Sequence, residues 1–150
     1  MEQSGATVLV EDDEDHAFLA RWALDSMKKA RSLIWLRDGE EALSYLTGAG
    51  APTGGEAPAP KLILLDINLP KVSGKEVLRQ IRSCAGLNTT PVVMLTTSDR
   101  QEDVAECYAL GANSYVIKPV QFEDLSRKLR AIVRYWRDMN HTQMGSPGQA

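Results

Sequence analysis

The chain has 150 residues, a length that suits one domain, and 43% of them are apolar, which is enough for a hydrophobic core. Its 17 basic and 20 acidic residues give a net charge of −3, without the excess of positive charge that marks nucleic-acid binding. The apolar runs are too short for a transmembrane helix, the N-terminus has no signal-peptide pattern, and the two cysteines form no CxxC pair. We therefore expect a soluble, cytoplasmic, single-domain protein that binds neither nucleic acid nor a membrane.

The N-terminal third alternates between short apolar runs and segments with helical periodicity. Residues 6–10 and 32–36 are β-rich apolar runs, each typical of a buried strand. Between them, apolar residues at helical spacing predict a helix to about Lys29. Asp38 is a candidate N-cap for a second helix, which we expect to end at Gly48.

Residues 48–60, GAGAPTGGEAPAP, consist almost entirely of Gly, Ala and Pro and predict a surface loop. The loop is long for a helix-to-strand connection, which usually has about 2–6 residues. We interpret it as a tolerated insertion, with a partner-contact loop as the alternative.

The second half of the chain continues the alternation. Three more apolar runs predict buried strands, at residues 62–65, 91–95 and 114–117. Helical spacing predicts a helix over 74–84. A further helix is expected to begin at a cap on Ser98 or Asp99 and to end at Gly111.

A last helix of about five turns has apolar residues on more than one face. Its core-facing stripe is predicted to be Phe122, Leu125, Leu129, Ile132, Val133 and Trp136. Tyr135 and Met139 lie four residues apart on a different face, which predicts a homodimer contact. Residues 141–150 contain no Asp, Glu, Lys or Arg and no periodicity, so we expect a disordered tail after a domain spanning 1–140.

Five short strands alternating with five helices define the fold class. Runs that are apolar on both faces imply a parallel sheet covered by helices on both sides. Right-handed crossovers then give a doubly wound α/β fold. In such sheets, ligands bind beyond the carboxyl ends of the strands.

Polar residues follow four of the predicted strands directly: Glu11, Asp12 and Asp13, then Asp66, Thr96 and Lys118. A parallel sheet brings these strand ends to one edge. Several carboxylates crowded there need a counter-charge, which a hard divalent cation such as Mg²⁺ or Ca²⁺ supplies. A lysine suits phosphate oxygens and a hydroxyl adds a hydrogen bond, so the set matches phosphoryl transfer to a carboxylate.

Each of these residues also has an ordinary structural interpretation. The acidic stretch 11–15 could be a solvated helix N-terminus, Asp66 a turn residue, Thr96 a cap and Lys118 a surface lysine. A functional site is favoured because all of them follow an apolar strand and fall at the same sheet edge.

The segments VLVEDDED, LILLDINLPKVSG, VVMLTTSD and GANSYVIKP resemble the blocks of a CheY-like receiver domain of two-component signalling, in the same order, over residues 6–137. The resemblance implies the flavodoxin-like strand order 2-1-3-4-5. EDDEDHA, the DINLP turn, the Gly/Ala/Pro insertion and the long last helix ending in VRYW are similar to single-domain response regulators that partner phytochrome-type histidine kinases.

The resemblance implies a role for each acidic residue at this edge of the sheet. Asp66 matches the phosphoacceptor, which is also a metal ligand, and Asp12 matches the carboxylate that binds Mg²⁺ directly. Glu11 matches its neighbour, which holds the metal through water, and the backbone carbonyl of Asn68 would be a further ligand. Asp13 lies one position beyond the acidic pair and is a weaker candidate.

The remaining family roles concern switching. Thr96 matches the switch hydroxyl, Lys118 the phosphate-binding lysine and Tyr115 the aromatic switch position. The resemblance implies a cis Lys118–Pro119 bond. Thr97 replaces a residue that is often alanine in the family, with an expected effect on the dephosphorylation rate.

The predicted function is a response regulator that accepts a phosphoryl group from the phosphohistidine of a sensor kinase, of the phytochrome type on the narrower resemblance. It is not an enzyme, since it turns over no external substrate, and its downstream target is another protein. The alternatives are an aspartyl-phosphate hydrolase, which needs an aspartate where Asn68 stands, and an unphosphorylated pseudo-receiver, which would lack one of these polar residues. A DNA-binding regulator is not expected, because little chain follows the last helix.

Overall fold

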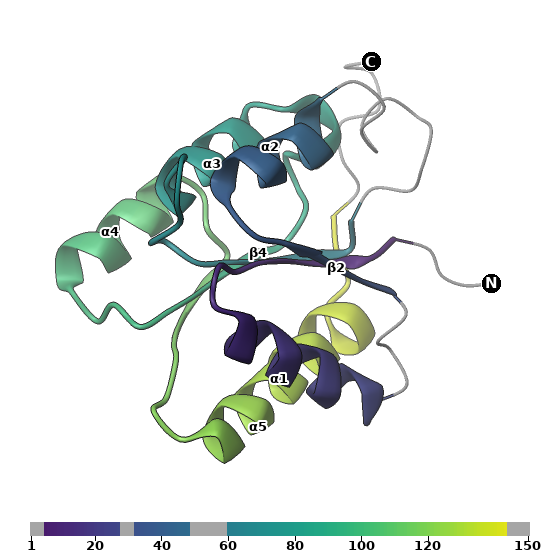
Figure 1. The fold of residues 1–150 in the computed structure, drawn as a ribbon. Helices are drawn as coiled ribbons and strands as arrows, with labels where there is room; N and C mark the ends of the chain where they lie inside the picture. The colour runs from purple at the N-terminus through teal and green to yellow at the C-terminus, as the bar shows by residue number, and fades with distance from the viewer. Residues whose placement is uncertain (1–4, 28–31, 49–59, 144–150) are drawn as a thin grey trace.

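The computed structural model describes residues 5–27, 32–48 and 60–143. Within these ranges strands and helices alternate along the chain, as predicted (Figure 1). The elements in chain order are β1 (Thr7–Val10), α1 (Glu14–Asp25), β2 (Leu33–Leu36), α2 (Gly39–Thr47), β3 (Leu62–Leu65), α3 (Gly74–Arg82), the 3-10 turn η3 (Ala85–Leu87), β4 (Val92–Thr96), α4 (Gln101–Ala109), β5 (Ser114–Ile117), α5 (Phe122–Val133) and the π-helical turn η4 (Arg134–Met139).

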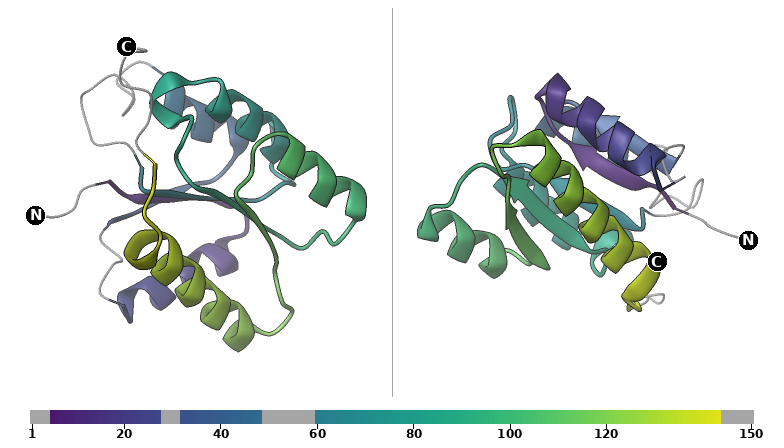
Figure 2. Two further views of the ribbon diagram at one scale, coloured as in Figure 1. Left: turned by 180° about the vertical axis from the view of Figure 1, so that it is seen from behind. Right: turned by 90° about the horizontal axis from the view of Figure 1, so that it is seen from below.

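The five strands form one parallel sheet in the order β2-β1-β3-β4-β5. Helices α1 and α5 cover one face, and α2, α3 and α4 lie on the other (Figures 1 and 2). The register pairs Leu65 of β3 with Val10 of β1 and with Met94 of β4, so these strands end at the same edge. The predicted fold class and strand order are confirmed.

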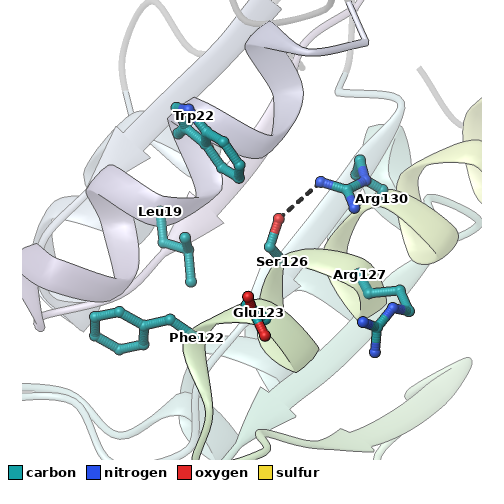
Figure 3. Close-up of a pocket in the computed structure, with 7 residues that line it drawn as sticks. All are labelled: Leu19, Trp22, Phe122, Glu123, Ser126, Arg127 and Arg130. Carbon is teal, nitrogen blue, oxygen red and sulfur yellow. Dashed lines mark hydrogen bonds between the residues drawn. The ribbon is translucent and has the colours of Figure 1, made fainter.

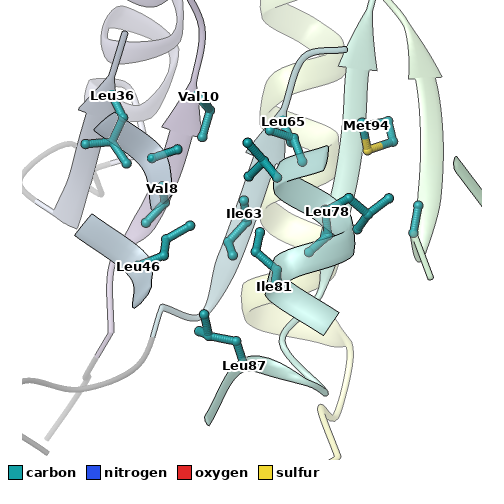
Figure 4. Packing of buried hydrophobic residues seen from close by; sticks show 14 of the residues in the cluster. Val8, Val10, Leu36, Leu46, Ile63, Leu65, Leu78, Ile81, Leu87 and Met94 are labelled. Atoms are coloured by element: carbon teal, nitrogen blue, oxygen red, sulfur yellow. The ribbon is translucent and has the colours of Figure 1, made fainter. Parts of the chain in front are cut away.

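Each strand contributes to two cores, because successive side chains point to opposite faces of a sheet. Ile63 and Leu65 pack on the side of α2 and α3 (Figure 4). Leu62 and Leu64 pack on the side of α1 and α5. All four residues of β3 are fully buried, so the central strand holds the residue that follows it, Asp66, at a well-defined position.

The first helix is shorter than the sequence predicts, because α1 ends at Asp25 and not near Lys29. Ser26 is its C-cap residue, and the Ser26 hydroxyl donates to the Ala23 carbonyl at 2.6 Å. This bond satisfies a carbonyl of the last turn, which a continuing helix would otherwise pair.

The predicted cap of α4 is wrong. The helix begins at Gln101 with Arg100 at the N-cap position, and neither Ser98 nor Asp99 caps it. The Ser98 hydroxyl instead donates to the Asp103 carboxylate in the first turn of the helix, at 2.5 Å. The N-cap therefore lies two residues after Ser98 and one residue after Asp99, so the helix begins later than predicted.

The last helix also departs from the predicted stripe. Phe122, its first residue, is 52% exposed and does not join the core, whereas Trp136 is partly buried against it. The helix closes with a π-type turn, in which the Asn140 N–H donates to the Tyr135 carbonyl at 2.6 Å. Tyr135 and Met139 are exposed, as the predicted second apolar face requires.

Some predictions fall outside the described residues, namely most of the loop 48–60 and of the tail 141–150. Cys84 and Cys107 are both free, in agreement with the absence of a CxxC pair. No helix in the described part of the chain combines the length and the hydropathy needed to cross a membrane.

Candidate functional site

Two neighbouring strands end in carboxylates at the same edge of the sheet. Glu11 follows β1 and Asp66 follows β3, and the Asp66 N–H donates to the carbonyl of Val10 at 3.2 Å. Asp12 completes the cluster, since one carboxylate oxygen from each of the three acidic residues lies within 4.8 Å of the others. Glu11 and Asp66 are buried and Asp12 is exposed, so the cluster is reached from solvent on the Asp12 side.

The acidic cluster (Glu11, Asp12 and Asp66) has the chemistry of a divalent-cation site. Three carboxylates this close repel one another unless a positive charge lies among them. An all-oxygen donor set suits Mg²⁺ or Ca²⁺, which are hard cations, better than a thiolate- or imidazole-binding metal. The residues that the sequence singled out as carboxylate ligands are therefore brought together and fit such an ion.

Lys118, which follows β5, is the cation that the structure places among these carboxylates. Its Nζ lies 2.5 Å from a Glu11 oxygen, 3.1 Å from Asp66 Oδ2 and 3.0 Å from Nδ1 of His16. Burial by itself would lower the pKa of Lys118, but the Asp66 and Glu11 carboxylates raise it above its ordinary value. Burial raises the pKa of Glu11, and the ammonium offsets part of that rise.

Asp13 has a structural task and lies outside the acidic cluster. It is the N-cap of α1, where its carboxylate accepts from the N–H groups of Asp15 at 2.9 Å and His16 at 3.2 Å. Helix capping therefore accounts for an aspartate at position 13, and no metal-binding role is needed to explain it.

The loop after β3 is held by its backbone. The Asn68 N–H donates to an Asp66 carboxylate oxygen at 3.4 Å, and the Gly74 N–H donates to the Ile67 carbonyl at 2.8 Å. A Cβ on Gly74 would lie 1.9 Å from the Asp66 carbonyl oxygen. Only glycine fits there, and the close approach brings the start of α3 against the residue that carries the candidate chemistry.

Replacing Gly74 by alanine should destabilise the protein by about 1–3 kcal/mol, the usual cost of forcing extra atoms into a packed site. The added Cβ meets the backbone of Asp66, which cannot turn aside as a flexible side chain could. Urea unfolding followed by circular dichroism measures the loss. A midpoint equal to that of the wild type would show that the loop yields without cost.

Thr96 is the last residue of β4 and is fully buried beside this edge. Its carbonyl accepts from the Lys118 N–H at 2.7 Å, and its hydroxyl accepts from the Ser98 N–H at 3.4 Å. Tyr115 is half-buried, and its hydroxyl donates to the Ser98 carbonyl at 2.9 Å. Thr96 and Tyr115, both singled out from the sequence, are thus joined through one residue of the β4–α4 loop.

A network that the sequence analysis missed holds the same loop. Lys75 of α3 donates to Asp103 and Glu106 of α4, each at 2.6 Å, and the Ser98 hydroxyl donates to the other Asp103 oxygen. The Asp103 and Glu106 hydrogen bonds raise the pKa of Lys75, and the Lys75 and Ser98 hydrogen bonds lower that of Asp103. Lys75 is 28 residues from Asp103 and 31 from Glu106, and all three lie inside helices, so no local sequence pattern predicts these contacts.

The Lys118–Pro119 bond is trans, since the described residues contain no cis peptide bond. The expectation of a cis bond is therefore wrong. It rested on the family resemblance alone, and an X–Pro bond is intrinsically more stable in the trans form.

An apolar surface groove lies elsewhere, between α1 and the start of α5 (Figure 3). It has a volume of about 540 Å³ and contains none of the strand-end residues. Its lining combines apolar and charged side chains, among them Leu19, Trp22, Phe122, Arg127 and Arg130. The described residues that line the groove include no cluster of carboxylates, whereas the three acidic residues that could bind a cation lie together at the sheet edge.

Comparisons with known proteins agree with the fold. The response regulator receiver domain family matches residues 7–130, and the chain belongs to this family. The chain is 43% identical to the probable methanogenesis regulatory protein FilR2 of Methanothrix harundinacea, covering 95% of this chain and 88% of that protein. It is 39% identical to the response regulator Rcp1 of Synechocystis, over 86% of each chain.

Among solved structures, the phosphorylated cyanobacterial phytochrome response regulator RcpA superposes with a TM-score of 0.84 at 34% identity, covering 93% of this chain and 99% of that one. The protein is thus a response regulator with a receiver fold, close to regulators of the phytochrome group. This membership sets aside the aspartyl-phosphate hydrolase that the sequence left open.

Proposed function

We propose that Asp66 accepts the phosphoryl group. The observation that carries the proposal is a buried carboxylate, 3.1 Å from a buried ammonium, inside a cluster of three acidic residues. An Asp66 oxygen attacks the phosphorus of a phosphohistidine, the P–N bond breaks, and the imidazole leaves with the electron pair and takes up a proton. The products are an acyl phosphate and a neutral histidine, so no external substrate is turned over.

The metal that fits this chemistry is Mg²⁺. Asp12, Asp66 and the backbone carbonyl of Asn68 would bind it directly, and Glu11 would hold it through water. Support comes from the oxygen-only cluster and from Rcp1, a relative whose structure has been solved with Mn²⁺ bound. Such an ion supplies positive charge to phosphoryl oxygens during transfer.

The new phosphoryl group acts as the switch. It adds negative charge and strong acceptor oxygens, which attract the Lys118 ammonium and the Thr96 hydroxyl. Movement of Thr96 would disturb Ser98, whose N–H donates to the Thr96 hydroxyl. The Ser98 carbonyl in turn accepts the hydrogen bond from the Tyr115 hydroxyl. Tyr115 would then turn inward and repack the face formed by α4, β5 and α5, in a population shift between two packings.

The proposed donor is a sensor histidine kinase of the phytochrome type, since the relative RcpA is a phytochrome response regulator. A kinase draws its phosphoryl group from ATP, so we place the encounter in the cytoplasm. The direct test mixes the purified chain with Mg²⁺ and acetyl phosphate. The protein should gain one phosphoryl group, and chelation of Mg²⁺ should prevent the gain.

We also propose that the protein forms a homodimer through its C-terminal helix. Tyr135 and Met139 are 46% and 68% exposed, and Tyr135 stands edge-on against Trp136, with ring centroids 5.0 Å apart. A rigid aromatic group beside a flexible thioether is common at protein interfaces. A two-fold pair is the usual arrangement.

Sedimentation velocity at micromolar concentration tests the dimer. The wild type should sediment as a dimer and the Tyr135→Glu/Met139→Glu variant as a monomer, because buried unpaired carboxylates oppose association. Trp22→Glu, a change at an exposed aromatic residue of α1, should leave the dimer intact. A wild type that is monomeric with and without phosphorylation would end the proposal, and a double variant that stays dimeric would place the interface elsewhere.

A further inference from the structure

We propose that His16 is a positioning residue for Lys118. His16 keeps the Lys118 ammonium in place when a cation enters the acidic cluster. The proposal rests on the phosphate-binding role proposed for Lys118. It adds a residue from the first turn of α1, where the sequence showed only an acidic stretch followed by a histidine.

The imidazole of His16 is held on two sides. Its Nδ1 lies 3.0 Å from Lys118 Nζ, and its backbone N–H is fixed by the Asp13 carboxylate that caps α1. On the other side, Phe122 meets the ring edge-on, with centroids 6.3 Å apart and an interplanar angle of 81°. The half-exposed Phe122, which the core does not use, thus has a contact that orients His16.

The contact defines the proton on the ring. The Lys118 ammonium can only donate hydrogen bonds, so His16 Nδ1 must accept with its lone pair. The proton of the neutral ring is then on Nε2. His16 is the third acceptor of an ammonium that has three protons to donate.

His16 differs from the other two acceptors in one respect. Glu11 and Asp66 are also the carboxylates that a divalent cation would claim, and the cation would repel the Lys118 ammonium. A neutral imidazole nitrogen is a poor ligand for Mg²⁺, which prefers oxygen. His16 can therefore still accept a hydrogen bond from Lys118 when the carboxylates of Glu11 and Asp66 interact with the metal.

NMR of the histidine ring nitrogens in the wild type tests the contact between His16 Nδ1 and Lys118 Nζ, and it needs no measurement of phosphorylation. His141 is the only other histidine in the chain, so His141→Asn leaves one ring to assign. At mildly alkaline pH, His16 should show a proton on Nε2 and an accepting Nδ1, and addition of Mg²⁺ should preserve that pattern. A proton on Nδ1, or a change of tautomer on adding Mg²⁺, would overturn the proposal.

Phosphorylation by acetyl phosphate tests the consequence, since this small donor needs no docking surface. His16→Leu should slow the reaction at saturating Mg²⁺ by about tenfold, the effect of losing one hydrogen bond to a charged group. His16→Asn should restore most of the rate, because its side-chain oxygen can stand near the position of Nδ1. His16→Leu should add little in a Lys118→Met background, where its partner is missing.

The possible failures are distinguishable. A His16→Leu protein as fast as the wild type would overturn the role of His16 while leaving that of Lys118 intact. Additive effects of the two substitutions would show that His16 does not act through Lys118. A Lys118→Met protein as fast as the wild type would contradict the phosphate-binding role proposed for Lys118, whereas loss of phosphorylation in every variant and in the wild type would contradict the proposed function itself.

Discussion

The Asp66→Asn variant should fold like the wild type and lose all phosphorylation by acetyl phosphate or by a kinase. The amide has the shape of the carboxylate but is far less nucleophilic, so no acyl phosphate forms. The Lys118 ammonium keeps Glu11 and His16 as acceptors, so the buried site retains its main ion pair. Intact-protein mass spectrometry measures the phosphoryl group, and thermal unfolding confirms the fold.

Asp13→Asn is the matched control, since it changes a carboxylate at the same sheet edge that only caps α1. An asparagine caps a helix nearly as well as an aspartate, so stability should change little. This variant should be phosphorylated to the wild-type level. Undiminished acyl-phosphate formation in Asp66→Asn would show that another residue is the acceptor.

Asp12→Ala should weaken Mg²⁺ binding by more than about tenfold, whereas Asp13→Ala should change it by less than about twofold. Of these two aspartates, only Asp12 belongs to the acidic cluster, in which carboxylate oxygens of Glu11, Asp12 and Asp66 lie within 4.8 Å of one another. Loss of a carboxylate that binds the ion directly removes both a ligand and a counter-charge. Calorimetric titration of Mg²⁺ into each variant gives the affinities.

Stability must be controlled in this comparison. Asp13→Ala removes an N-cap and should cost about 1 kcal/mol, so both titrations belong well below the unfolding temperature. Equal losses of affinity, or a greater loss in Asp13→Ala, would show that the assignment of the acidic stretch is displaced by one residue.

The fold could be predicted because burial on both faces of the sheet leaves an unmistakable pattern. A strand such as Leu62–Leu65, with four large apolar residues in succession, is not typical of an edge or a surface element. Helix ends were predicted less well. Ser26 ends α1 through its own hydroxyl, and Ser98 gives its hydroxyl to Asp103, and both are choices of local hydrogen bonding that hydrophobic periodicity does not encode.

The acidic edge was predictable for a topological reason, because strand ends in a parallel sheet converge wherever they occur in the sequence. Glu11, Asp66 and Lys118 each follow an apolar run directly, and the structure joins them. His16 and Lys75 lie inside helices, and their partners are more than 25 residues away in the chain. No pattern of spacing indicates which side of a helix will meet such a partner, so these contacts needed the structure.

The central claim is that a phosphohistidine transfers its phosphoryl group to Asp66. The most direct measurement incubates the wild-type protein with an autophosphorylated phytochrome-type histidine kinase and Mg²⁺, then reduces the acyl phosphate with borohydride and maps the modified residue by peptide mass spectrometry. We predict that the kinase loses its phosphoryl label, introduced with labelled ATP, and that Asp66, and no other residue, is converted to homoserine. Label that leaves the kinase and modifies a different residue, or that never reaches the protein from any such kinase while acetyl phosphate also fails, would contradict the account.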